Sequence, residues 1–390
     1  CVTGLTTVDT ATYWSPFGQA VIAAGIVVGG LGVMTLASIL GFAVSRHLGL
    51  TQRMLATQET GTGAMGQIST LLKAVIATSL SMQALLAAMF LPRFLAMGFD
   101  PVRAIWDAVF MAISVFNNAG FVILPDGLAP HVTDWWMLIP IILGTTVGAI
   151  GFPVIMDVAK NLRTPRRWRL HTKLTLSTYL ILAFVGALAM ALTEWHNPTT
   201  LGAIDTPSKI LNAMLAGVNS RSSGLSALDV GAMHSQTHFV QDILMMIGGG
   251  SASTAGGVKV TTFAVLVLAV IAEARGDRDI ETFGRRIPTS TIRLSVAVSL
   301  LGLALVAISV VLLMSMTDYT LDIILFETVS AFATVGLSTG ITPILPVGAK
   351  YVLIFLMFAG RTGSMTVAAA LALRQRSRVI RMPEEQPIIG

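Results

Sequence analysis

Four short turns, each with one glycine among small residues, are where residue type and spacing could do chemistry in this 390-residue sequence. The glycines are Gly4, Gly120, Gly224 and Gly336, spaced by 116, 104 and 112 residues. Glycine tolerates positive φ and has no Cβ, so it lets a backbone carbonyl approach a narrow axis. Rings of such carbonyls can replace the hydration shell of a monovalent cation.

The residues around these glycines favour one kind of site. Two turns carry serine, phenylalanine and a small polar residue at the same offsets: Ser114, Phe116 and Asn118 before Gly120, and Ser330, Phe332 and Thr334 before Gly336. No turn has Asp, Glu or His beside its glycine, as a divalent-metal site would need. We therefore expect carbonyl coordination of K⁺ or Na⁺ by Val2, Thr3, Gly4, Asn118, Ala119, Gly120, Ser222, Ser223, Gly224, Thr334, Val335 and Gly336. A glycine-rich turn can also be a plain connection between helices, which four turns in register disfavour.

A second unusual segment, GGGSASTAGGVK at 248–259, lies inside an apolar run long enough to cross a membrane. Glycine costs about 1 kcal/mol against alanine in a helix interior, so five glycines predict a break. Freed backbone groups in a bilayer need protein or water partners. We expect the break to face the pore just below the glycine turns, as a gating loop over 248–257 formed by Gly248, Gly249, Gly250, Ser251, Ser253, Gly256 and Gly257. Close helix packing through small residues is the alternative.

Two charged residues lie at membrane depth and are functional candidates by default, because a buried charge is costly. Arg361 lies between Gly360 and Gly363 and would form an electrostatic barrier on a cation pathway. The structural alternatives are a salt bridge to Asp107 or Glu327, or extension of the side chain to the membrane surface. Lys259 follows the glycine-rich segment and would hold the loop closed or extend to the membrane surface. An intramembrane hydrolase using Ser251 or Ser253 is disfavoured, because no apolar run has a central histidine base.

The elements that must position these residues are membrane helices. The chain is 54% hydrophobic and 12% charged, far from a soluble domain. Seven apolar runs reach the length that spans a bilayer: 17–45, 69–91, 135–160, 172–194, 237–273, 288–316 and 349–373. Three shorter segments, 103–117, 206–219 and 320–333, each end at a glycine turn. They are predicted to be re-entrant half-helices, which exist at membrane depth only when buried or lining water.

A unit of helix, half-helix, turn and helix therefore recurs. The fold class is predicted to be an all-α polytopic membrane protein with four pseudo-symmetric helix–pore-loop–helix repeats around one ion pore. The repeats are expected at 1–52, 53–165, 166–286 and 287–380, followed by a tail at 381–390. The first repeat is incomplete at the N-terminus, since only its turn and second helix are present, and we expect residues upstream of Cys1.

Charge predicts the orientation. Lys and Arg concentrate after the first, third and fifth crossings and in the C-terminal tail, so this face is expected to be cytoplasmic. The glycine turns then face the extracellular side. The net charge of +5 reflects this orientation and not nucleic-acid binding.

These motifs, GLTTVD, SVFNNAGF, SRSSGL, SAFATVGLS and above all GGGSASTAGGVKVTTF, make the whole chain resemble the Trk/Ktr/HKT superfamily of potassium transporters. The tail PEEQPIIG resembles the Ktr branch, with a Trk-type transporter as the alternative. Glycine in all four turns resembles potassium-preferring members, whereas serine in the first turn is typical of sodium-permeable plant relatives.

The resemblance implies more than the residues themselves do. It implies K⁺ as the transported ion, uptake that in this branch is often Na⁺-dependent, and a homodimer with one pore per subunit in the cell membrane. It also implies a cytoplasmic ring of regulatory subunits, which bind ATP or ADP, so that nucleotide is bound only by the partner. The intramembrane loop and an arginine matching Arg361 gate the pore in this family.

Overall fold

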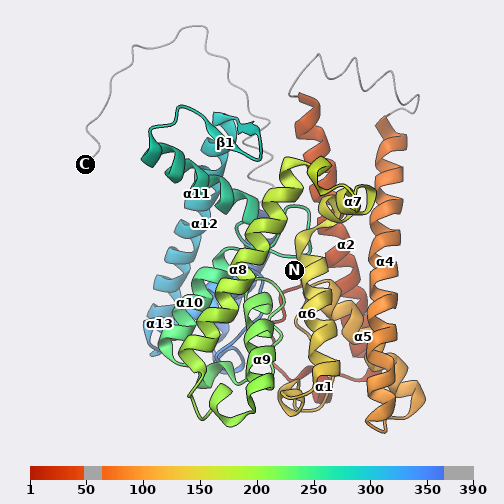
Figure 1. Cartoon of the computed structure of the whole chain (residues 1–390). Coiled ribbons are helices and arrows are strands. Elements are labelled where there is room, and N and C mark those ends of the chain that lie inside the picture. Colours follow the sequence, from red (N-terminus) through yellow and green to blue (C-terminus); the bar gives the residue numbers. More distant parts are fainter. Residues whose placement is uncertain (48–63, 364–390) are drawn as a thin grey trace.

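The computed structural model describes residues 1–47 and 64–363 as a bundle of helices (Figure 1). Four long helices are α2 (Pro16–His47), α4 (Ala64–Ala96), α8 (Leu170–Glu194) and α12 (Thr289–Met316). Four others follow the glycine turns and the buried loop: α6 (Trp135–Ile150), α10 (Ser235–Met246), α11 (Val260–Arg275) and α14 (Val347–Phe358), which continues into a short π-helix (Ala359–Gly363). Short elements are α1 (Thr10–Tyr13) and the 3₁₀ turns Ala129–His131, Pro165–Arg167, Leu201–Ala203, Val230–Ala232 and Thr342–Ile344.

Three short helices match the predicted half-helices: α5 (Pro101–Phe116), α9 (Thr206–Asn219) and α13 (Leu321–Phe332). All three lie in the same half of the molecule, among the longer helices (Figure 1). The start of α5 is fixed by Pro101 and by the carboxylate of Asp100, which accepts the amide of Val102 at 3.1 Å. Each half-helix ends at a glycine turn, so the prediction of three half-helices is confirmed.

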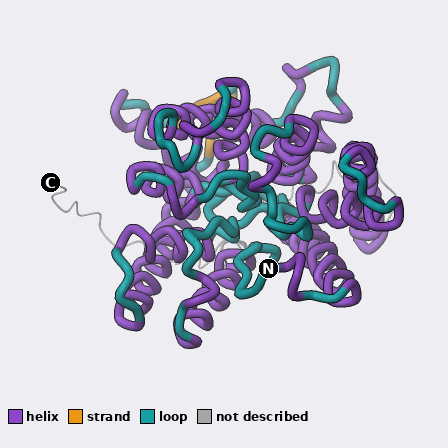
Figure 2. The backbone as a smooth tube through the Cα atoms, turned by 90° about the horizontal axis from the view of Figure 1, so that it is seen from below, coloured by secondary structure: helices purple, strands orange, loops and turns teal. Residues whose placement is uncertain are grey.

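The half-helices are packed in the same way. Each contacts the long helix that precedes it in sequence: α5 contacts α4, α9 contacts α8, and α13 contacts α12. Each also contacts the helix that follows the previous glycine turn: α5 contacts α2, α9 contacts α6, and α13 contacts α10. The view along the axis shows the result, with loops gathered at the centre and helices around them (Figure 2).

Membrane-spanning length is met by three described segments, Leu72–Ala96, Leu170–Glu194 and Thr289–Met316. The sequence predicted a single crossing over 135–160, and this is corrected. The chain bends by 96° at Gly151 (φ 93°), between α6 and α7 (Phe152–Lys160). Counting that bent pair as one span gives a fourth crossing of the seven predicted. These helices make the chain a multi-pass membrane protein.

The prediction of an all-α fold needs one correction. Two short strands, β1 (Ile280–Thr282) and β2 (Arg285–Ile287), pair antiparallel after α11. Phe283 and Gly284 join them with positive φ at both residues, the conformation of a two-residue hairpin turn. The hairpin and α7 lie at the same end of the molecule (Figure 1). The predicted tail, 381–390, and the end of the last predicted crossing lie outside the described residues.

Candidate functional site

The four predicted glycines meet in one closed ring. A Cβ atom added to Gly4 would lie 2.5 Å from the carbonyl oxygen of Ala119, and one on Gly120 would lie 2.6 Å from that of Ser223. Cβ atoms on Gly224 and Gly336 would overlap the carbonyl oxygens of Val335 and Thr3 even more closely. Every contacted carbonyl belongs to the residue just before the next glycine, and the last contact returns to the first turn. A side chain at any of the four positions would therefore collide with the neighbouring turn.

Backbone conformation supplies a second reason for glycine. The φ angles of Gly4, Gly120, Gly224 and Gly336 are 93°, 74°, 63° and 95°. L-residues rarely adopt this region, and glycine adopts it without steric cost. In three turns the residue two positions earlier also has positive φ: Val2 (59°), Asn118 (55°) and Thr334 (51°). Positive φ at the β-branched residues Val2 and Thr334 is strained, as is common at functional sites.

The half-helices α5 and α13 end at this ring with the same hydrogen bonds. The amide of Asn118 donates to the carbonyl of Val115 (3.1 Å) and that of Ala119 to Ser114 (2.8 Å). Equivalent amides of Thr334 and Val335 donate to Ala331 (3.1 Å) and Ser330 (2.9 Å). This is the Schellman arrangement that ends a helix. It directs the negative end of each helix dipole toward the ring, where a cation is favoured.

The third turn is built differently. The amides of Ser222, Ser223 and Gly224 all donate to the carbonyl of Asn219, at 3.1, 3.1 and 3.3 Å. Ser222 is also not among the described residues with positive φ. The sequence match between the second and fourth turns therefore reflects shared backbone geometry. The weaker match of the third turn reflects its different backbone hydrogen bonding.

Burial repeats around the ring. In all four turns the two residues before the glycine are buried, and the glycine itself is partly exposed. Several buried polar atoms here have no hydrogen-bond partner among the described residues: Oγ1 of Thr3 and Thr334, Oγ of Ser222 and Ser223, and Oδ1 of Asn118. Buried polar atoms in proteins are normally paired, so unpaired ones beside a ring of carbonyls indicate a place for a bound ligand or water.

The helices that follow the turns pack closely against them. A Cβ on Gly29 of α2 would lie 2.6 Å from the Cγ2 atom of Val2. Cβ atoms on Gly148 of α6 and Gly360 of the π-helix would overlap the carbonyl oxygens of Phe116 and Phe332, the last residues of α5 and α13. These three glycines thus let a helix pack against the turn region that precedes it.

The predicted break in the run 237–273 is confirmed. The chain leaves α10 at Met246 and re-enters a helix at Val260, and residues 248–257 are buried except Ser251, which is half-buried. The loop is fixed to α6, since the amide of Gly250 donates to the carbonyl of Ala149 at 2.7 Å. Its other end reaches α13, because a Cβ on Gly256 would lie 2.7 Å from the carbonyl oxygen of Ala333. The loop therefore crosses from α6, which follows the second turn, to the end of α13, which precedes the fourth turn.

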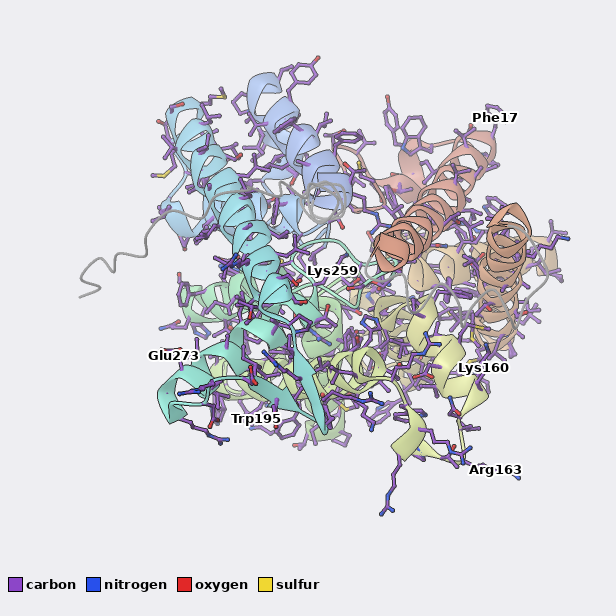
Figure 3. All side chains as sticks on the ribbon, turned by 90° about the horizontal axis from the view of Figure 1, so that it is seen from above. Phe17, Lys160, Arg163, Trp195, Lys259 and Glu273 are labelled. Carbon is purple, nitrogen blue, oxygen red and sulfur yellow. The ribbon has the colours of Figure 1, made fainter. Side chains whose placement is uncertain are left out.

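The two charged residues singled out in the sequence, Lys259 and Arg361, donate hydrogen bonds to adjacent carbonyls of this loop. The Nζ atom of Lys259 donates to the carbonyl of Ala255 at 2.6 Å, and Nη1 of Arg361 donates to that of Thr254. Arg361 is buried, and its Nε and Nη2 atoms have no hydrogen-bond partner in the described residues. Viewed from the end of the molecule that carries Lys160 and Arg163, Lys259 lies near the centre (Figure 3).

The carboxylates considered as partners of Arg361 lie elsewhere. Asp107 forms an ion pair with Arg103 at 3.4 Å. Glu327 accepts hydrogen bonds from Ser338 Oγ (2.6 Å), the amide of Thr339 (2.8 Å) and Thr342 Oγ1 (2.7 Å), and so ties the segment after Gly336 to α13. Within the described part of the chain, no carboxylate forms an ion pair with Arg361.

Two important groups were not identified from sequence. Thr254 is fully buried and hydrogen-bonds to both the second turn and Arg361. Arg221, three residues before Gly224, is also fully buried, and its Cζ atom lies 3.6 Å from the centroid of the Tyr179 ring. Arginine at membrane depth is a sequence signal that could have identified the second group. Thr254 had no such signal, because only its contacts distinguish it from its neighbours.

Among the residues that the structure describes, the loop serines Ser251 and Ser253 contact backbone and threonine oxygens and no histidine. Ser253 Oγ donates to the carbonyl of Gly250 at 2.6 Å, and Ser251 Oγ lies 3.1 Å from Thr261 Oγ1. His238 Nε2 donates to the carbonyl of Val230 at 2.7 Å, and His234 Nδ1 lies 3.2 Å from Glu194. These contacts give no serine–histidine pair for a hydrolase.

The chain is similar to several known proteins. The model of the TrkH family, described as cation transport protein, matches residues 1–379. The chain is 38% identical to Ktr system potassium uptake protein B of Bacillus subtilis over all of this chain and 87% of that protein. It is 33% identical to the protein of the same name from Vibrio alginolyticus, over all of this chain and 85% of that protein. It is also 32% identical to the potassium/sodium uptake protein NtpJ of Enterococcus hirae, over all of this chain and 87% of that protein.

A solved structure shares the fold. The crystal structure of the potassium transporter TrkH from Vibrio parahaemolyticus aligns with a TM-score of 0.72 and 16% sequence identity, over 96% of this chain and 75% of that chain. The family is one of cation transporters, so the chain is not an enzyme. The match of residues 1–379 to the family model and the identity to the two Ktr proteins show that the chain belongs to the TrkH family of cation transport proteins.

Proposed function

We propose that this protein takes up K⁺ across the cell membrane through a selectivity filter formed by the four glycine turns. The observation that carries the proposal is the closed ring, in which each glycine contacts the carbonyl just before the next. Carbonyl rings of this kind coordinate dehydrated monovalent cations. The ends of α5, α9 and α13 add a negative potential at the same place. The potassium uptake activities in the names of the relatives support K⁺ as the ion.

The gate is proposed to be the loop 248–257 together with Arg361 and Lys259. Support comes from its position, since it contacts both the second and the fourth turn regions. Arg361 places a positive charge on this loop, which would repel a passing cation until the loop moves. In the proposed closed state, Arg361 and Lys259 hold the loop by hydrogen bonds to the carbonyls of Thr254 and Ala255.

The architecture is proposed to be four pseudo-symmetric repeats at 1–52, 53–165, 166–286 and 287–380, with the first represented by its turn and second helix. The repeated packing of α5, α9 and α13 supports this division. The end with α7 and β1 is proposed to be cytoplasmic and the half-helix end extracellular, because the connections at the first end carry the basic residues.

The partners are proposed from resemblance. The relatives named as parts of a Ktr system support a multi-component assembly. We propose a homodimer whose cytoplasmic face binds a regulatory ring of nucleotide-binding subunits, with ATP or ADP bound by that partner alone. Na⁺ is proposed as a coupled or competing ion, which the name of the potassium/sodium relative supports.

Ion flux into proteoliposomes tests the central proposal. Full-length purified protein should take up K⁺ faster than Na⁺ at equal concentrations, because carbonyl rings held by close backbone contacts suit the larger ion. Empty liposomes and heat-denatured protein provide the baseline. Equal K⁺ and Na⁺ rates would replace the K⁺ filter with a non-selective cation pathway, and a lack of flux for both ions would contradict transport by this chain alone.

A further inference from the structure

We infer that Thr254 couples the intramembrane loop to the second glycine turn, so that loop opening and ion binding in the filter influence each other. This inference rests on the proposed function, and it assigns a positioning role to Thr254, a residue of the loop 248–257 that was not among the individually predicted gate residues. It also predicts that the ion selectivity of the filter depends on the conformation of the gating loop.

Thr254 uses every polar group it has to hold the loop in place. Its Oγ1 atom accepts a hydrogen bond from Asn118 Nδ2 at 2.5 Å and donates to the carbonyl of Phe116 at 3.2 Å. Its amide donates to the carbonyl of Gly148 at 3.3 Å, and its carbonyl accepts from Arg361. Since the side chain is fully buried, these bonds are not exchanged with bulk water while the loop stays in place.

Asn118 makes this connection specific to the filter. It lies two residues before Gly120, in the strained positive-φ position, and its amide is fixed to α5 through Val115. Its Nδ2 atom reaches the loop, whereas its Oδ1 atom has no hydrogen-bond partner among the described residues. A rotation of the Asn118 backbone would therefore alter both the filter turn and the bond to Thr254. At the fourth turn the loop instead meets Ala333 and Thr334 by close packing at Gly256.

The geometry has a functional consequence. Opening the loop requires loss of both hydroxyl bonds of Thr254 and of its bond to Arg361. If the second turn relaxes when the bond to Asn118 breaks, the filter changes its ion preference as the gate opens. Coupling between two sites is reciprocal, so an ion that stabilises the second turn in this conformation also stabilises the closed conformation of the loop.

The test compares two substitutions that each change one group of the threonine side chain. Thr254→Val keeps the shape of the side chain and removes the hydroxyl, while Thr254→Ser keeps the hydroxyl and serves as the matched control. Thr254→Val should raise K⁺ flux in proteoliposomes about tenfold, equivalent to about 1.4 kcal/mol, and should lower the K⁺/Na⁺ flux ratio. Thr254→Ser should retain the wild-type flux and ratio. A changed K⁺/Na⁺ flux ratio would indicate coupling to the filter, because a loop that is only destabilised would raise the flux without changing the ratio.

A double-mutant cycle identifies the bond. Asn118→Gly removes the side-chain carboxamide, and glycine can still adopt the positive φ of this position. If the two residues act through one bond, Asn118→Gly with Thr254→Val should match the stronger single variant instead of multiplying the two effects. Independent, multiplying effects would overturn the inference, as would wild-type flux and ratio in Thr254→Val. Should Thr254→Val fail to fold, unchanged flux in Asn118→Gly alone would also overturn it. Absence of K⁺ flux in the wild-type protein would instead reject the proposed function.

Discussion

Individual residues in this protein are selected by backbone geometry as much as by chemistry. The four glycines of the ring combine positive φ with a neighbouring carbonyl placed where a Cβ would be. Either condition alone could be met at some cost by another residue, but both together leave only glycine. The polar atoms around them are mostly uncharged, which suits an ion that must bind and then leave.

Arg221 is the exception, because it brings a fixed positive charge beside the third turn. It lies three residues before Gly224, and the described residues give its guanidinium no hydrogen-bond acceptor. Its Cζ atom lies over the Tyr179 ring, 3.6 Å from the ring centroid. Tyr179 also packs with Ile247 and Ala255, so the pair lies between the third turn and the loop.

Removing the ring should therefore disturb the third turn. Tyr179→Leu should lower thermal stability by about 2 kcal/mol, the value of a desolvated cation–π contact, and reduce K⁺/Na⁺ selectivity. Tyr179→Phe keeps the ring and should behave like the wild type in both measurements. Thermal unfolding in detergent and flux in proteoliposomes provide the readouts. Equal effects of leucine and phenylalanine would show that the hydroxyl, and not the ring, matters.

At the scale of elements, interruptions of helices form the ring and the buried loop. Each half-helix stops at the ring, α10 and α11 are separated by the loop, and α6 and α7 are bent by 96°. Gly151 forms this bend, and a Cβ added to it would lie 2.7 Å from the carbonyl oxygen of Ser251. The bend and the loop are therefore in direct contact.

Substitution at the bend should affect the loop. Gly151→Ala should raise K⁺ flux, because the new methyl group displaces the loop at Ser251. Gly98→Ala is a matched control, since Gly98 also has positive φ (83°) but has open space where a Cβ would lie. Both positions have positive φ, and Gly151 (φ 93°, ψ 152°) lies in a region that is essentially restricted to glycine, where another residue costs about 1–3 kcal/mol. Comparable flux in the two variants would contradict the link between bend and gate.

At the scale of the whole molecule, four distant segments form one site. The turns are more than 100 residues apart in sequence, and their contacts run in cyclic order from Gly4 through Gly120 and Gly224 to Gly336 and back. A closed ring distributes any distortion, because each turn supports the next.

The closed ring predicts that the four glycines are equivalent in their effect. Alanine at any one should lower K⁺ flux at least about tenfold and reduce the K⁺/Na⁺ ratio, since each Cβ would strike the neighbouring carbonyl. Gly25→Ala is the control, because a Cβ at this position of α2 has nothing within 4 Å. A single tolerant position among the four would show that the ring is open there in the working protein.

Much of this could be predicted from sequence, because membranes constrain chains strongly. Apolar length predicted most of the helix positions, short apolar segments before polar glycine turns predicted the half-helices, and five clustered glycines predicted the break after α10. These are local properties, determined by backbone propensity and the absence of water. The bend at Gly151 was missed because α6 and α7 read as one continuous apolar run.

Only the tertiary structure decided which groups meet. Sequence predicted a charge barrier at Arg361, with a salt bridge to Asp107 or Glu327 as an alternative. Folding brings its guanidinium to the carbonyl of Thr254, 107 residues away. It likewise brings Asn118 to Thr254 and Arg221 to Tyr179. Side-chain partners depend on helix packing across the whole chain, and backbone carbonyls are present at every residue. A sequence therefore determines that such groups exist and leaves their pairing to the fold.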